Sequence, residues 1–304
     1  MAEQFRMVTI GDSVLWGQGL KESEKIDTLL RADFRPQNPQ DVRLDRTAHS
    51  GAVIFSGSSN EAPRVGEVPG SRASILEQCA GFHDNPQDVD FVLINGGIND
   101  VGVATILNPF APSLTTPIKE ACGYRMGMLL EAVKQKFSKP SARIRVLGYY
   151  PILSSKSLTS ARQLGAATSF LQLYGVALPT FGKQITVEHI NPIVDRCEQF
   201  FRESTECLVE AVRRAGDSRI RFVHSGFTDD NSVFARKSLL WGVHLDPNLS
   251  PEDNVAQTRH QLCDAAFQNQ NNPLALEECY RASAGHPNAA GAVHLQERIW
   301  ATVG

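Results

Sequence analysis

Residues Arg6 to Ser13 read RMVTIGDS, a short run of β-forming residues followed at once by a glycine, an aspartate and a serine. Val and Ile favour strands and Gly favours a tight turn, so we expect a buried strand over Arg6–Ile10 that ends in a turn. A serine between a strand and a helix lies near the unpaired N–H groups of the helix N-terminus, which favour negative charge. Ser13 can therefore serve as a nucleophile, or it can simply cap the helix that follows.

Similar β-rich runs recur along the chain between longer stretches with helical spacing. The predicted strands are Arg6–Ile10, Val42–Thr47, Phe91–Asn95, Ile144–Tyr149 and Ile220–Val223. The predicted helices between and after them include Tyr124–Phe137, Ile193–Ala215 and Ala289–Thr302. This alternation predicts an α/β protein with a mostly parallel sheet, and in such sheets ligands bind beyond the carboxyl ends of the strands.

The composition is that of an ordinary globular protein. The chain has 304 residues, of which 42% are hydrophobic and 21% are charged, with a formal net charge of -3. It has no basic block longer than a pair, which argues against nucleic acid as a partner. No run approaches the roughly 20 apolar residues of a transmembrane helix, and the N-terminus leaves no room for a signal peptide. We expect a cytoplasmic protein, with a trimmed leader or leaderless export left open.

The cysteines indicate neither a zinc ribbon nor a redox motif, because none of them forms a CxxC pair. We expect most of them to be reduced and buried. Cys263 and Cys279 flank one loop-rich segment and could form a disulfide in an oxidising compartment. The six cysteines are Cys79, Cys122, Cys197, Cys207, Cys263 and Cys279.

Three further polar turns can carry chemistry. Gly51 follows the second predicted strand, and its N–H could donate to an anion. Asn99 follows the third, and its side-chain amide could point at a developing oxyanion. His286 precedes Pro287 and a predicted helix, where it would be held stiffly, as a general base should be. Each turn also has a purely structural interpretation, since Gly and Asn favour turns and a lone His is often incidental.

The ordered set of these turns resembles the blocks of the SGNH hydrolases, also called the GDSL esterase/lipase family. The matching residues are Gly11-Asp12-Ser13 with Gly17, then Gly51, then Gly97-x-Asn99-Asp100, and last His286 with Pro287. The Gly-x-Ser-x-Gly elbow of the α/β-hydrolases is absent from the chain. The resemblance implies a three-layer α/β/α, flavodoxin-like fold with a five-stranded sheet. We expect a single domain over residues 1–304, with insertions at about 152–192 and 226–285.

The resemblance also implies an activity and a site. Ser13 would be the nucleophile and His286 its base, with the Ser13 N–H, the Gly51 N–H and the Asn99 side chain forming the oxyanion hole. The expected reaction is hydrolysis of a small-molecule, lipid or sugar ester through an acyl-enzyme. An acyltransferase with the same site, or a weakened enzyme that has become a binding protein, is the alternative. No cofactor and no metal are expected, because the serine mechanism needs none and no HExxH, Walker or GxGxxG motif is present.

One residue departs from the family's pattern. The last block usually carries an aspartate three residues before the histidine, and this chain has Ser283 there. Three hypotheses stay open: a Ser-His dyad oriented by a backbone carbonyl or by the Ser283 hydroxyl, a carboxylate from elsewhere, or a weakened enzyme. The candidate carboxylates are Glu277, Glu278, Asp246 and Asp264.

Aromatic residues of the insertions are candidates for the wall of an acyl pocket, although a place in the core is the interpretation that we favour for them. They are Phe170, Tyr174, Phe181 and Trp241.

Overall fold

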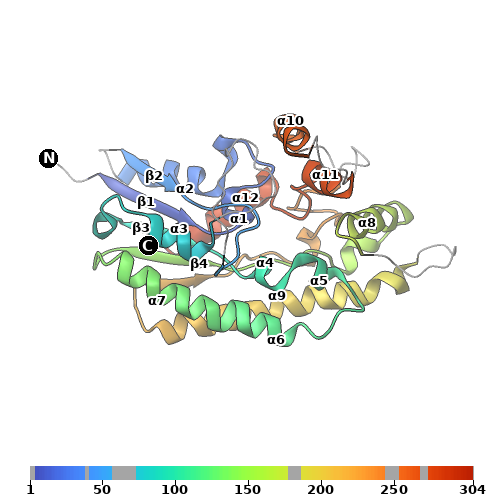
Figure 1. Cartoon of the computed structure of the whole chain (residues 1–304), viewed down its shortest axis with the longest axis horizontal. Helices are drawn as coiled ribbons and strands as arrows, with labels where there is room; N and C mark the ends of the chain where they lie inside the picture. Colours follow the sequence, from blue (N-terminus) through green and yellow to red (C-terminus); the bar gives the residue numbers. More distant parts are fainter. Residues whose placement is uncertain are drawn as a thin grey trace.

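The computed structural model describes residues 4–37, 41–56, 73–176, 186–243, 253–267 and 273–303. Its centre is one five-stranded sheet in the order β2-β1-β3-β4-β5, in which every pair of neighbours is parallel (Figure 1). The strands are β1 (Phe5–Ile10), β2 (Val42–Arg46), β3 (Phe91–Ile94), β4 (Arg143–Leu147) and β5 (Ile220–Val223). The prediction of an α/β fold with a parallel five-stranded sheet is confirmed.

The strands end slightly earlier than the apolar runs suggest. Asn95 lies just beyond β3, and Tyr149 lies two residues beyond β4. Both are buried polar side chains at the carboxyl edge of the sheet. A strand pattern cannot separate these residues from the strand, because a buried central strand of a parallel sheet is apolar on both faces and shows no alternation.

Helices cover both faces of the sheet. On one face, α2 and α12 contact each other; on the other, α3, α7 and α9 pack in succession (Figure 1). The prediction of three layers is therefore confirmed. The helices on the sheet are α2 (Ile26–Phe34), α3 (Ile75–Gly81), α7 (Met126–Lys136), α9 (Val187–Ala215) and α12 (Ala289–Trp300). Shorter helices follow strands or fill the insertions: α1 (Ser13–Trp16), α4 (Ile98–Val101), α5 (Val103–Leu107), α6 (Thr115–Ile118), α8 (Ala161–Leu173), α10 (Ala256–Phe267) and α11 (Pro273–Tyr280).

The two expected insertions are partly helical. The first contains α8, and the second contains α10 and α11. Helix α9 begins at Val187, before the predicted start at Ile193, and it contains Pro192. Proline removes one intrahelical hydrogen bond and usually marks a boundary. Here the buried side chains of Ile190 and Ile193, on either side of it, hold the helix against the core.

Helices α10 and α11 carry a small core of their own. A disulfide joins Cys263 to Cys279, and partly buried apolar side chains, including Phe267 and Leu276, pack around it. The conditional prediction that these two cysteines pair is thus realised, whereas the other four cysteines are free thiols. Helix α11 contacts both α10 and α8, and the three lie in the upper right part of the view in Figure 1.

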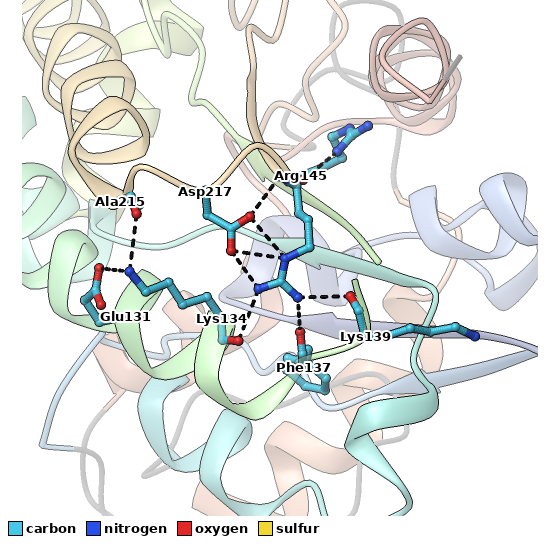
Figure 2. Close-up of polar contacts among 8 residues, drawn as sticks. Glu131, Lys134, Phe137, Lys139, Arg145, Ala215 and Asp217 are labelled. Carbon is cyan, nitrogen blue, oxygen red and sulfur yellow. Dashed lines mark hydrogen bonds and ion pairs between the residues drawn. The ribbon is translucent and has the colours of Figure 1, made fainter. Parts of the chain in front are cut away.

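At the amino edge of the sheet, an arginine joins α7 to the segment before β5. Arg219, just before β5, donates to the carbonyl oxygens of Phe137 and Lys139 and forms an ion pair with Asp217 (Figure 2). These carbonyls lie at and beyond the end of α7, where helices leave carbonyl groups unpaired. Arg219 therefore ties α7 to the amino edge of the sheet and leaves the carboxyl edge for the site.

Within the described residues, no helix is long and apolar enough to cross a membrane.

Candidate active site

The first turn is set by its neighbours. Asp12 caps α1 by accepting a hydrogen bond from the Val14 N–H at 2.9 Å, which places Ser13 at the first position of the helix. Gln78 of α3 holds Gly11 from the other side, accepting from its N–H at 2.8 Å and donating to its carbonyl at 3.1 Å. Ser13 is therefore presented at the carboxyl edge of the sheet by a turn fixed on both sides.

Ser13 and His286 are far apart in sequence but in direct contact in space. The Ser13 Oγ lies 2.7 Å from His286 Nε2, and His286 Nδ1 lies 3.2 Å from the carbonyl oxygen of Ser283. A carbonyl oxygen can only accept, so Nδ1 carries the proton in the neutral ring and Nε2 is free to accept. The Ser13 hydroxyl therefore donates to Nε2, the arrangement in which a histidine can remove the serine proton.

Three groups that can stabilise an oxyanion surround this pair. Within the described chain, neither the Ser13 N–H nor the Gly51 N–H donates a hydrogen bond. Gly51 adopts a left-handed conformation with φ +72°, which favours glycine. Asn99 uses one side-chain N–H to bind the carbonyl of Ala52 at 3.0 Å, which keeps its second N–H available. All three groups line one cavity with Ser13 and His286.

A buried network that the sequence did not predict connects the first and third turns. The Asp12 carboxylate accepts from the Asn95 side chain at 2.6 Å and from the Tyr149 hydroxyl at 2.7 Å. Tyr149 in turn accepts from the Ile98 N–H at 3.0 Å. Burial raises the pKa of Asp12, whereas its hydrogen bonds, first that from Tyr149, lower it. A single aspartate thus joins the turn of Ser13 to the helix that carries Asn99.

The second and third turns are also joined directly. The Asp100 carboxylate accepts from the Ile54 N–H at 3.0 Å and pairs with Arg125 at 3.1 Å. Burial raises the pKa of Asp100, while the Ile54 and Arg125 contacts lower it. These contacts fix the loop of Gly51 relative to Asn99, which an oxyanion hole requires.

The place of the missing family aspartate is taken by a different arrangement. The Ser283 carbonyl contacts His286, and the Ser283 hydroxyl donates to the carboxylate of Asp253 at 2.6 Å. Asp253 forms an ion pair with Arg259 at 2.5 Å, and both side chains are fully buried. Sequence reasoning missed Asp253, because it lies thirty residues before Ser283.

None of the carboxylates proposed from the sequence that the structure describes contacts His286. Glu277 pairs with Arg281 at 2.9 Å, and Asp264 accepts from the Tyr280 hydroxyl. Glu278 lines the cavity, where burial raises its pKa. The fourth candidate, Asp246, lies outside the described residues.

His286 is neutral over a wide pH range. Burial lowers its pKa to about 4, although the backbone hydrogen bonds to Ser283 and Ala284 and the charge of Asp253 act in the opposite direction. The charge of Arg259 adds to the lowering. A neutral imidazole is the form that can accept a proton, so this environment keeps the base competent in acidic solution.

The cavity beside Ser13 has a volume of about 560 Å³. Phe170 and Tyr174 line it, whereas the predicted wall residue Trp241 belongs to the core, and Phe181 lies outside the described residues. Charged side chains of Glu278 and Arg281 also reach the lining. The other apolar lining side chains include Val53, Ile98, Val103, Tyr150, Ile152 and Leu173.

Among the described residues, no group of three His, Cys, Asp or Glu side chains is placed to hold a metal ion.

No family model and no curated protein matches this chain, but solved structures do. The phospholipase A1 from Streptomyces albidoflavus NA297 aligns with a TM-score of 0.52 at 15% sequence identity, over 99% of this chain and 98% of that chain. The extracellular lipase from Streptomyces rimosus aligns with a TM-score of 0.47 at 16% identity, over 90% of this chain and 97% of that chain. Of these two, only the phospholipase A1 exceeds a TM-score of 0.5. With its sheet order and its layers, the chain has the fold of the SGNH hydrolases, the family that its sequence blocks resemble.

Proposed function

We propose that this protein hydrolyses carboxylic esters through an acyl-enzyme formed on Ser13. The observation that carries the proposal is the 2.7 Å contact between Ser13 Oγ and His286 Nε2, with the ring held by an acceptor on its other nitrogen. The SGNH fold supports the proposal, and so does the apolar cavity that opens beside the serine.

In the acylation step, the Ser13 oxygen attacks the ester carbonyl while His286 Nε2 takes the hydroxyl proton. Negative charge moves onto the carbonyl oxygen, where the N–H groups of Ser13 and Gly51 and the amide of Asn99 would receive it. The bond to the alcohol then breaks, and the protonated His286 donates its proton to the leaving oxygen. Ser13 is left carrying the acyl group.

In the deacylation step, His286 takes a proton from a water molecule as that water attacks the acyl carbonyl. The same three donors stabilise the second oxyanion. When the intermediate collapses, the proton returns from His286 to Ser13, and the carboxylic acid leaves. An alcohol in place of water would give the acyltransferase reaction with the same nucleophile and the same three donors.

The lining of the cavity supports an apolar acyl group as part of the substrate. Phe170, Ile152 and Leu173 line the cavity together with Tyr150 and Tyr174. Burying methylene groups against such side chains stabilises the complex by about 0.8 kcal/mol each. The proposed substrate is therefore an ester of a short to medium-length fatty acid.

The proposal is tested by labelling the purified protein with a fluorophosphonate probe and locating the adduct by peptide mass spectrometry. We expect labelling at Ser13, and a loss of p-nitrophenyl ester turnover of about 10³-fold or more in Ser13→Ala and His286→Ala. Ser218→Ala, at an exposed serine in the turn before β5, is the matched control and should keep full activity. A folded Ser13→Ala variant with undiminished turnover would refute the proposal.

A further inference from the structure

Asp253, Arg259 and Ser283 form a buried polar unit behind the candidate base. The Asp253 carboxylate accepts two hydrogen bonds from Arg259, at 2.9 and 2.5 Å, and one from the Ser283 hydroxyl, at 2.6 Å. Arg259 also donates to the carbonyl of Tyr280, at 2.8 Å from its terminal nitrogen. The side chains of Asp253 and Arg259 have no exposed surface, and Ser283 is fully buried.

We propose that Asp253 is a positioning residue for His286 that acts through Ser283, and so performs from one contact further away the orienting role of the missing aspartate. The inference rests on the proposed function, since it assigns a role within the same site. Ser283 is the link because its two ends bind different partners. Its hydroxyl is anchored on Asp253, and its carbonyl accepts from His286 Nδ1.

The contact between Ser283 and Asp253 is needed because the Ser283 carbonyl alone does not fix the orientation of the imidazole ring. The Ser283 oxygen lies 3.2 Å from Nδ1 and also accepts the backbone N–H of His286 at 2.9 Å. A carbonyl that serves two donors orients the imidazole only if the peptide that carries it cannot rotate. The charge-assisted bond from the Ser283 hydroxyl to Asp253 prevents that rotation, since such bonds are short and strong.

The charge of Arg259 changes the effect that Asp253 has on His286. A bare carboxylate near the ring would stabilise the imidazolium directly, but the charge of Arg259 lowers the pKa of His286 and so opposes this effect. The ion pair therefore contributes mainly geometry. Among the residues that the structure describes, the charged groups near the ring include Asp253 and Arg259 behind it, and Glu278 and Arg281 on the cavity side.

Helices α10 and α11 hold the pair in place. Arg259 lies on α10, and Tyr280, whose carbonyl it binds, is the last residue of α11. The disulfide between Cys263 and Cys279 joins the same two helices next to these residues. Ser283 follows α11 by three residues, so the cross-linked pair of helices leads directly into the segment that orients the base.

The test is a double-mutant cycle of Ser283→Ala and Asp253→Asn, with two readouts on the full chain. Ser283→Ala removes the hydroxyl and keeps the carbonyl. We expect kcat for a p-nitrophenyl ester to fall about 10- to 100-fold, the range of one lost hydrogen bond to a charged group, with KM within about twofold. The double variant should lose no more than the more damaged single variant, since both changes break one link.

The second readout needs no turnover: the downfield proton resonance of His286 Nδ1–H in nuclear magnetic resonance spectra. We expect a slowly exchanging signal in the unmodified protein and its loss or fast exchange in Ser283→Ala. Because Asp253→Asn leaves Arg259 without its partner and can prevent folding, Ser283→Ala alone decides in that case. Ser204→Ala, at a fully buried serine of α9, is the matched control.

The outcomes separate the two proposals. An unmodified protein without ester turnover, but with an Nδ1–H signal that Ser283→Ala abolishes, would refute the hydrolase and support the positioning role. An active protein whose Ser283→Ala variant keeps both kcat and the signal would refute the positioning role alone. Losses that add in the double variant would also overturn it, because they would show independent effects.

Discussion

His286 has a low pKa, yet it lies where it could accept a proton from Ser13. Its pKa is lowered to about 4, mainly by burial, so it is a weak base in the resting protein. Its Nε2 nevertheless lies at hydrogen-bond distance from the hydroxyl that it would deprotonate. The two fit together if the proton transfer occurs only when the oxyanion forms, because the negative charge then stabilises the nearby imidazolium.

This low pKa predicts activity in acidic solution. The base must be neutral to act, and a lowered pKa keeps it neutral at lower pH, so the acid limb of kcat/KM should lie near pH 4 and not near 6.5. The measurement is kcat/KM for a neutral ester between pH 3.5 and 8, with circular dichroism at each pH to verify folding. Glu278→Gln should leave the limb in place, and a limb between pH 6 and 7 would contradict the prediction.

The candidate site residues that match short motifs could be predicted from the sequence, whereas the residues that hold them in position could not. Ser13, Gly51, Asn99 and His286 follow from turns after strands and from the order of the blocks. Asp253 could not be predicted, because its contact with Ser283 depends on how a long insertion folds back.

Tyr149 joins two elements that lie on neighbouring strands. It follows β4, and its hydroxyl bridges the Asp12 carboxylate after β1 and the N–H of Ile98 at the start of α4. The ring is buried next to Phe200 of α9, with ring centres 5.5 Å apart. One phenol thus bridges the turn that carries Ser13 and the helix that carries Asn99.

Replacing this phenol should damage turnover more than binding. Tyr149→Phe leaves the Ile98 N–H without its acceptor and removes one donor from Asp12. We expect these changes to lower the free energy of unfolding by about 1 to 3 kcal/mol. We expect a lower melting temperature and a fall in kcat, with a smaller change in KM, measured by calorimetry and steady-state kinetics. Tyr124→Phe, at a tyrosine that is 64% exposed, is the matched control. A Tyr149→Phe variant with unchanged kcat would show that Tyr149 only stabilises the fold.

The elements of the sheet layers were largely predictable, whereas those of the insertions were not. Short runs of β-forming residues predict the strands, and α12 begins close to the position that Pro287 indicates. Helix α9 begins six residues before its predicted start at Ile193 and continues through Pro192, a residue that usually interrupts helices. Helices α10 and α11 depend on a disulfide and on partners outside their own sequence.

In the whole molecule, the cavity lies where the sheet meets its insertions. The turns after β1 and β3 supply its polar side, and α8 supplies Phe170 and Leu173. The segment after α11 brings His286 to the same place. The parallel sheet therefore presents the candidate site residues, and the insertions form part of the cavity wall beside them.

Filling this space should change the preferred acyl length. Leu173→Trp places a larger side chain at the end of α8. If it excludes two methylene groups of the acyl chain from the cavity, at about 0.8 kcal/mol each, kcat/KM should fall about 15-fold. We expect that loss for p-nitrophenyl octanoate and little change for the acetate, measured side by side. Val209→Trp, at a half-exposed position of α9, is the control. An equal loss for both esters would place the acyl chain elsewhere.

The carbonyl that His286 uses as its acceptor belongs to the main chain, and every codon at position 283 encodes one. A lineage can therefore lose an aspartate at this position in a single nucleotide step or in several while the imidazole keeps an acceptor throughout. Selection then acts only on how firmly that acceptor is held, through the serine hydroxyl and the buried ion pair behind it. A pattern that requires an aspartate three residues before the histidine would therefore reject a chain whose histidine still has an acceptor for its Nδ1–H.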